Sequence, residues 1–350
     1  MDHRMTRTTT GNRVRALFIL LLAASCTNTS GPDVEHDAEE HVPQQRSGPP
    51  TPLFDPDSAY AYVADQVAFG PRVPGSPAHK ACGDWIVRRL RAFGAQVTEQ
   101  QGVVTAFNGQ KVPMRNIIAS WLPEAKQRVM LCAHWDTRPF ADKDKDRPNE
   151  PIDGANDGGS GVGVLLEIGR HLNELVAPVA GDAPGIGVDL IFFDVEDMGE
   201  PANAMVGERN SMDSWCLGSQ YWSRGPHVPG YNARFGILLD MCGARDAVFY
   251  QEAISMRYAA GIVRKVWRTA DRSGYGDRFV PETKYFVGTD DHDVINRVLR
   301  IPTVDIIEFY EPTGGFHPSW HTHGDNITII DPATLKAVGQ TVMEVVWSER

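Results

Sequence analysis

Imidazole and carboxylate side chains recur along this 350-residue sequence, after apolar runs or in turns. The positions are His134, Asp157, Glu196, Asp197, Asp240, Asp290 and His321. Acids gathered at one place repel one another or stay protonated unless a cation holds them. A divalent ion with nitrogen and oxygen ligands resolves this conflict, and zinc suits a mixed set of donors. A single aspartate after a strand is often only a turn former, so it is the recurrence that predicts a metal site.

Apolar runs predict the strands that would position these side chains. The segments 129–133, 188–195 and 235–239 are nearly continuous in apolar residues, which is typical of strands buried on both faces. The segment 303–309 predicts a further strand. In an open α/β sheet the carboxyl ends of parallel strands form the crevice where ligands bind. The potential ligands that follow these runs are therefore expected to lie together in this crevice.

The remaining periodicity completes an α/β pattern. Apolar residues recur at helical spacing in 78–93, 162–172 and 331–345. A glycine stops the first of these segments, and an Asp-Pro pair caps the start of the last. The segments 96–106 and 112–121 predict two more strands. With no internal repeat, we infer one large α/β domain.

The N-terminal segment has the pattern of an export signal. Four arginines precede the short apolar run 16–24, which is too short to cross a bilayer as a helix. Cys26 follows small residues, as at a lipoprotein processing site, although Ala23 stands where leucine is commoner. We expect residues 1–26 to form an export or lipoprotein signal, with Cys26 as the lipid-bearing residue after cleavage. The protein is then periplasmic or at the cell surface; secretion without lipid is the alternative.

Composition bounds the rest of the chain. Residues 27–52 are rich in Pro, Ser, Gly and acids, which predicts a flexible tether ahead of a catalytic domain at 53–350. The net charge of −11 argues against nucleic acid or an anionic membrane as a partner. Four cysteines follow Cys26 without CxxC spacing, so a zinc–cysteine site is not expected.

Six short motifs resemble a known family in their order and spacing. They are His134-Trp135-Asp136, Gly154-Ala155-Asn156-Asp157, Phe193-Asp194-Val195-Glu196-Asp197, Leu239-Asp240, Asp290-Asp291-His292 and Trp320-His321-Thr322. Together they resemble the zinc aminopeptidase-like metallopeptidases, and most closely the zinc-dependent glutaminyl-peptide cyclotransferases (glutaminyl cyclases). The resemblance implies a three-layer α/β/α fold around a mixed, mostly parallel twisted sheet.

The resemblance implies one zinc ion per chain, held by Asp157, Asp197 and His321. It makes Glu196 the carboxylate that transfers protons. The family often has glutamate where this chain has Asp197, which shortens that ligand by one methylene. Asp136 is expected to orient a neighbouring backbone turn or the histidine two residues before it.

The remaining site residues are also implied by the resemblance. Asp240 and Asp290 would form an acidic hydrogen-bond network beside the proton-transferring carboxylate. Trp320 and Phe316 would line the pocket for the substrate side chain. The family has an aromatic residue shortly after the catalytic carboxylate, and here Trp215 is the candidate for that substrate-binding role or is simply part of the core.

The implied reaction converts the N-terminal glutamine of a peptide or protein to pyroglutamate and releases ammonia. A two-zinc aminopeptidase is the main alternative, because its ligand set is present as well. That set is His134, Asp157 as the bridge, Asp197, Asp240 and His321. A third reading is a catalytically silent lipoprotein that binds peptides.

Overall fold

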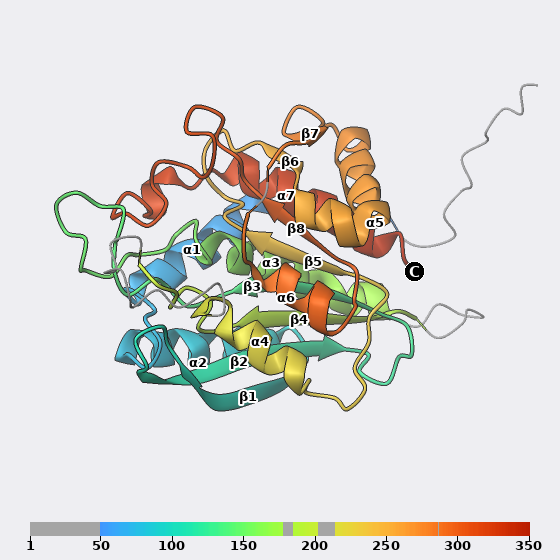
Figure 1. Cartoon of the computed structure of the whole chain (residues 1–350). Coiled ribbons are helices and arrows are strands. Elements are labelled where there is room, and N and C mark those ends of the chain that lie inside the picture. Colours follow the sequence, from blue (N-terminus) through green and yellow to red (C-terminus); the bar gives the residue numbers. More distant parts are fainter. Residues whose placement is uncertain (1–49, 178–184, 202–213, 286) are drawn as a thin grey trace, which may run out of the picture. The chain divides into compact units, whose positions relative to one another are not determined.

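The central element is a six-stranded sheet (Figure 1). The computed structural model describes residues 50–177, 185–201, 214–285 and 287–350. The strands are β1 (Gln96–Thr105), β2 (Lys111–Trp121), β3 (Arg128–His134), β4 (Gly187–Phe193), β5 (Gly236–Asp240) and β8 (Thr303–Ile307), in the order β1-β2-β4-β3-β5-β8. The last four pair in parallel, while β2 is antiparallel to both β1 and β4. The sheet is therefore mixed and mostly parallel, as expected.

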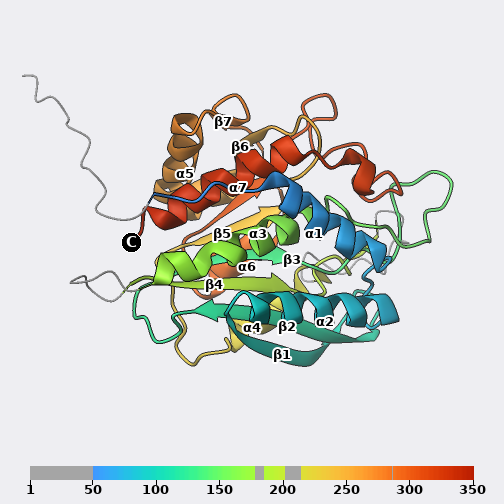
Figure 2. The ribbon, with the colours of Figure 1, turned by 180° about the vertical axis from the view of Figure 1, so that it is seen from behind.

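One face of the sheet is covered by four helices, which lie in front of it in Figure 2. They are α1 (Pro56–Ala68), α2 (Pro77–Ala92), α3 (Gly159–Val176) and α7 (Pro332–Trp347). Their ends match the stop and start signals of the sequence: Ser76 caps α2, Asp331 caps α7, and Gly94 adopts φ 89° just after α2.

The opposite face carries α4 (Leu217–Arg224) and α6 (Asp291–Val298), in front of the sheet in Figure 1. The helix α5 (Ala253–Arg272) packs against α7 and β8, beside a small two-stranded sheet of β6 (Phe249–Gln251) and β7 (Phe279–Thr283). A short 3₁₀ turn, η2 (Ile327–Ile329), precedes α7. These layers confirm the expected α/β/α fold.

Burial on both faces explains the apolar runs, since every residue of β3, β4, β5 and β8 is buried. Two of these strands, β4 and β8, end earlier than the apolar runs do. The run at 188–195 ends as a strand at Phe193 because Val195 turns into the left-handed backbone region, at φ 57°. The run at 303–309 ends as a strand at Ile307.

The expected signal segment, the anchor at Cys26 and residues 27–49 of the tether lie outside the described residues. Among the residues that are described, none of the helices combines the length and the apolar character needed to cross a membrane.

Candidate active site

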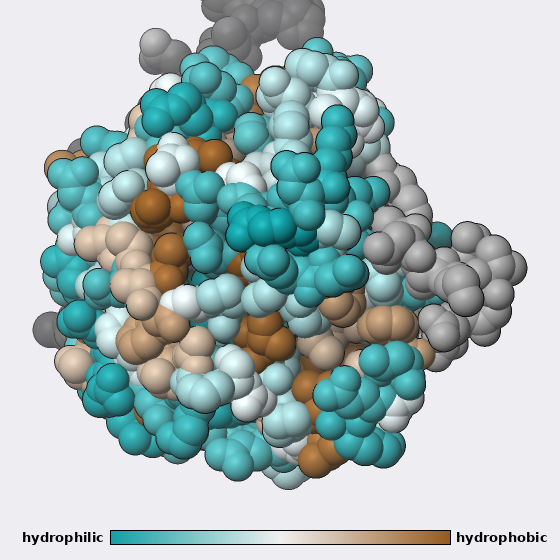
Figure 3. All heavy atoms as spheres, turned by 90° about the vertical axis from the view of Figure 1, so that its left-hand side faces the viewer, coloured by the Kyte–Doolittle hydropathy of each residue, from teal (hydrophilic) through white to brown (hydrophobic). Residues whose placement is uncertain are grey.

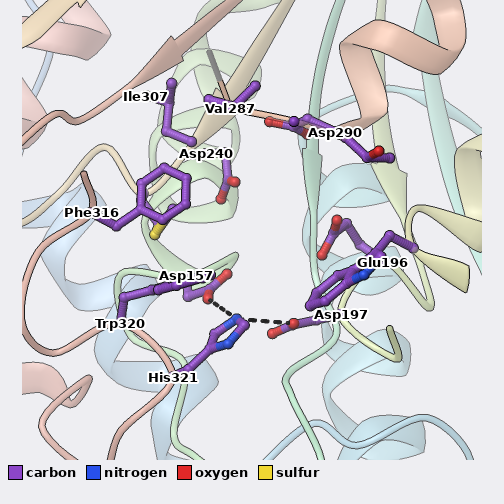
Figure 4. Close-up of a pocket in the computed structure, with 14 residues that line it drawn as sticks. Asp157, Glu196, Asp197, Asp240, Val287, Asp290, Ile307, Phe316, Trp320 and His321 are labelled. Atoms are coloured by element: carbon purple, nitrogen blue, oxygen red, sulfur yellow. Dashed lines mark ion pairs between the residues drawn. The ribbon is translucent and has the colours of Figure 1, made fainter. Parts of the chain in front are cut away.

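The side chains of Asp157, Asp197 and His321 converge at the carboxyl edge of the sheet (Figure 4). Nε2 of His321 lies 3.4 Å from Oδ1 of Asp197 and 3.7 Å from Oδ2 of Asp157. All three residues are at least 96% buried. Within the described residues, Oδ2 of Asp157 and Oδ2 of Asp197 have no hydrogen-bond partner. Two buried carboxylates with free oxygens beside an imidazole fit a zinc ion.

A second triad shares one of these acids. Nε2 of His134 lies 3.0 Å from Oδ1 of Asp157 and 3.4 Å from Oδ1 of Asp240. Asp157 therefore stands between two sets of donors, each with its ligand atoms within 4.8 Å of one another. The five residues of the two-metal alternative are thus all assembled, so their geometry does not separate the two readings.

The turn before α3 places Asp157. The Asp325 carboxylate accepts the backbone N–H groups of Asn156 (2.7 Å) and Asp157 (3.0 Å), which ties this turn to the segment after β8. The next residue, Gly158, adopts φ 79°, and a Cβ there would lie 2.8 Å from Cε1 of His134. Only glycine fits a left-handed position packed this closely.

The end of β4 is fixed from the end of β3. The Asp136 carboxylate accepts the backbone N–H groups of Glu196 (3.0 Å) and Asp197 (3.2 Å). It lies 3.6 Å from Nδ1 of His134. Of the two expectations for Asp136, orienting a neighbouring backbone turn is the one with hydrogen bonds to support it.

Glu196 lies beside the three converging ligands and lines the same pocket. Burial raises the pKa of its carboxyl well above the ordinary value, and the neighbouring acids Asp197, Asp291 and Asp290 raise it further. Cys216 donates a hydrogen bond from its thiol to Oε1 of Glu196, at 3.2 Å. A carboxyl group with a raised pKa can exchange protons near neutral pH.

Asp240 and Asp290 also line this pocket. Burial raises the pKa of Asp240 to about 7, and the charge of Asp290 contributes in the same direction. Asp290 is the N-cap of α6 and accepts the backbone N–H of Asp291. The two acids therefore face the pocket, and among the described contacts no hydrogen bond joins them to each other or to Glu196.

The pocket has a volume of about 220 Å³, and aromatic rings form part of its wall. Phe316 and Trp320 pack edge to face, with ring centroids 4.7 Å apart. Trp215 stacks parallel to the His321 ring at 6.0 Å, so it belongs to the pocket. Figure 3 shows the side toward which the arrowheads of β4 and β5 point in Figure 1; apolar patches there interrupt a mainly hydrophilic surface.

The sequence did not single out Arg138 and Asp142, which lie in the polar loop after β3. The Arg138 side chain is fully buried and contacts Asp197, while Asp142 contacts His321. The one available signal was their spacing of four residues, which allowed an ion pair but did not place it.

Comparisons with known proteins show which family this chain resembles. The model of peptidase family M28 matches residues 116–346. A glutaminyl-peptide cyclotransferase of Drosophila melanogaster is 27% identical over 286 residues, covering 75% of this chain and 73% of its own length. The crystal structure of Bacteroides thetaiotaomicron glutaminyl cyclase bound to N-acetylhistamine is 51% identical, with a TM-score of 0.81, covering 86% of this chain and all of that one.

A Zn-dependent exopeptidase from Parabacteroides distasonis, also solved, is 50% identical with a TM-score of 0.80. The match covers 85% of this chain and 99% of that one. The family model spans well over half of the sequence and contains every residue of both triads. This chain is a member of peptidase family M28.

Proposed function

We propose that this chain is a zinc-dependent glutaminyl-peptide cyclotransferase. It converts the N-terminal glutamine of peptides or proteins to pyroglutamate and releases ammonia. The observation that carries the proposal is the position of Glu196, a carboxyl that lines the pocket beside the converging side chains of Asp157, Asp197 and His321. The names of similar proteins from bacteria and animals support the same activity.

One zinc ion, held by Asp157, Asp197 and His321, would act as a Lewis acid on the γ-carboxamide oxygen of the substrate. Glu196 takes a proton from the α-amine as its nitrogen attacks the γ-carbonyl carbon. Glu196 then returns a proton to the amide nitrogen, and the bond from carbon to that nitrogen breaks to release ammonia. The charge of Asp290 helps to hold the pKa of Glu196 high, and Asp240 lines the same pocket.

The pocket walls suit this intramolecular reaction. Both reacting groups belong to one residue, so the protein mainly has to hold a curled side chain and exclude water. Phe316, Trp320 and Trp215 supply apolar surface for that purpose. A cavity of about 220 Å³ has room for the side chain and the α-amine of an N-terminal glutamine.

A two-zinc aminopeptidase is the second candidate, because the triad of His134, Asp157 and Asp240 is present, but the similarity to glutaminyl cyclases does not favour it. In that case Glu196 would activate a water molecule by accepting its proton, and the product would be a free amino acid. The number of zinc ions per chain and the identity of the product distinguish the two activities.

Mass spectrometry of a Gln-initiated peptide incubated with the zinc-loaded protein tests the proposal. Loss of ammonia with the chain length unchanged is the expected result; loss of the first residue would establish the peptidase instead. Glu196→Gln should lower turnover about 10²- to 10⁴-fold while zinc still binds. The matched control is Glu124→Gln, since Glu124 is exposed and far along the chain from the pocket residues. Unchanged turnover in Glu196→Gln would exclude Glu196 as the proton carrier.

Export and lipid attachment remain proposals that rest on the sequence of residues 1–26. Labelling of the expressed chain with a radioactive fatty acid tests them, with Cys26→Ala as the variant that should lose the label. An activity assay on a chain starting at residue 53 tests the proposed boundary of the catalytic domain: this chain should release ammonia from a Gln-initiated peptide without the tether.

A further inference from the structure

The buried side chain of Arg138 contacts one proposed zinc ligand, Asp197, and is linked through Asp142 to a second, His321. Nη1 of Arg138 lies 3.2 Å from Oδ1 of Asp197 and donates to the backbone carbonyl oxygen of the same residue at 3.1 Å. On its other edge the guanidinium makes a two-point contact with Asp142, from Nε at 2.7 Å and from Nη2 at 3.0 Å. Oδ1 of Asp142 in turn lies 3.1 Å from Nδ1 of His321.

We propose that Arg138 and Asp142 are positioning residues that hold Asp197 and His321 in the geometry zinc requires; the inference rests on the zinc site of the proposed function. Asp197 comes from the end of β4 and His321 from the segment after β8. The Asp142–Arg138 pair is the polar bridge between them. Oδ1 of Asp197 accepts from the guanidinium, and within the described residues its Oδ2 has no hydrogen-bond partner.

The ring of His321 is oriented in the same way. Asp142 faces Nδ1, which leaves Nε2 directed at Asp157 and Asp197. A carboxylate beside the far nitrogen of a metal-binding histidine fixes its tautomer and its angle, and such partners strengthen metal binding. The bridge therefore acts on both ligands at once.

Arg138 itself does not face the substrate. Its side chain is fully buried, and it is absent from the residues that line the pocket. The guanidinium packs against two rings, 4.7 Å from the centroid of Phe140 and 4.6 Å from that of Trp215. A planar group packed against aromatic rings, with donors on two edges, holds carboxylates at set angles, which the single ammonium of a lysine cannot do.

The loop that carries the pair is also fastened to the His321 segment. The backbone N–H of Lys143 donates to the carbonyl oxygen of His321 at 3.1 Å. Oδ2 of Asp144 accepts the backbone N–H of His323 at 3.1 Å and lies 2.8 Å from Nδ1 of that residue. These contacts fix the distance between the loop and the segment, so the Asp142 carboxylate is held against the His321 ring.

Burying an arginine between two aspartates costs desolvation energy that the pairing only partly returns. Such a pair is a weak source of stability. Its effect is expected on the geometry of the metal site and therefore on zinc affinity.

The test measures the zinc Kd by competition with a chromophoric chelator. Arg138→Met, Arg138→Lys and Asp142→Asn should each raise the Kd about 10- to 100-fold. Lysine keeps the positive charge but lacks the planar guanidinium and its several N–H donors, so Arg138→Lys should not restore wild-type affinity. The matched control is Arg147→Met, because Arg147 lies in the same loop, is half exposed and pairs with Glu150 on the surface. Its Kd should stay within twofold of wild type.

The absorption spectrum of the cobalt-substituted protein adds a readout of ligand geometry that a merely structural role leaves unchanged. A shift of the visible bands in Asp142→Asn is expected. Asparagine matches aspartate in shape, so this variant supplies the answer if Arg138→Met does not fold. Wild-type Kd and spectra in folded Asp142→Asn would overturn the inference, whereas failure of the wild-type protein to bind zinc would overturn the proposed function instead.

Discussion

The thiol of Cys216 donates a hydrogen bond to Oε1 of Glu196 across 3.2 Å. Cys216 is fully buried and is the N-cap of α4, in the left-handed backbone region at φ 56°. Burial raises the pKa of this thiol well above its ordinary value, so the group is a neutral donor. The bond fixes one oxygen of the Glu196 carboxylate, and the other oxygen is left for proton transfer.

Replacing Cys216 should therefore affect catalysis modestly. A neutral hydrogen bond contributes about 0.5–1 kcal/mol, so Cys216→Ala should lower kcat/KM about twofold to fivefold. Cys216→Ser keeps a donor and should stay nearer to wild type. Cys82→Ala removes a thiol that is equally buried elsewhere and serves as the control. Equal kcat/KM values in all three variants would show that the thiol does not orient Glu196.

The one-zinc and two-zinc readings give His134 and Asp157 different roles. With one zinc per chain, Asp157→Asn should weaken zinc binding more than about 100-fold, because it removes a ligand. His134→Asn should keep one zinc per chain, since His134 is not a ligand in that reading. Elemental analysis after dialysis measures the stoichiometry. A loss of one of two bound zinc ions in His134→Asn would favour the aminopeptidase reading.

Two helical glycines should respond in opposite directions to alanine. A Cβ on Gly161 would lie 2.2 Å from the backbone oxygen of Leu239, where α3 meets β5, so Gly161→Ala should destabilise the fold by roughly 2–3 kcal/mol. Gly261 in α5 has open space around it and is exposed. Gly261→Ala should stabilise by about 0.5–1 kcal/mol. Urea unfolding measures both, and a neutral Gly161→Ala would contradict the close packing of α3 on β5.

Glu308 should make stability depend on pH. It is 2% exposed, and burial, together with Asp325 and Asp240, raises its pKa to about 8 in the folded protein. Between its ordinary pKa of 4.5 and 8, the unfolded chain loses this proton while the folded chain keeps it. The contribution of Glu308 to stability therefore falls as pH rises through this window.

Glu308→Gln removes that dependence. Urea unfolding in EDTA should show a smaller loss of stability from pH 5 to pH 8 in Glu308→Gln than in the wild-type protein, by at least about 1 kcal/mol. Asn156, which donates to Oε1 of Glu308, can donate equally to the glutamine oxygen. Glu124→Gln is the exposed control. Identical slopes for wild type and Glu308→Gln would mean that Glu308 ionises normally.

The sequence predicted the parts of the fold that simple burial determines. The strands β3, β4 and β5 follow from continuous apolar runs, and α2 and α7 follow from their caps. The helix α6 was not predicted. Its buried side chains include Asp291, His292 and Asp293, which look like surface residues until the acidic surroundings of the pocket are known.

The residues of the site likewise include some that the sequence predicted and some that it did not. Asp157, Asp197 and His321 converge in the structure, as the family motifs implied. Arg138 and Asp142 depend on how one loop packs against a segment almost two hundred residues later, which local pattern does not encode. The left-handed backbone of His321, at φ 57°, likewise follows from tertiary contacts and not from any turn-forming residue.

Asp157 and His321 lie far apart along the chain, with β4, β5 and β8 between them. Bringing them together requires the closure of a very long loop, which is slow compared with forming local helices. The rate of zinc uptake during refolding should therefore report when the segment that carries His321 docks beside Asp157. A fluorescent chelator that gives up its ion only after the C-terminal third has docked would time that step directly.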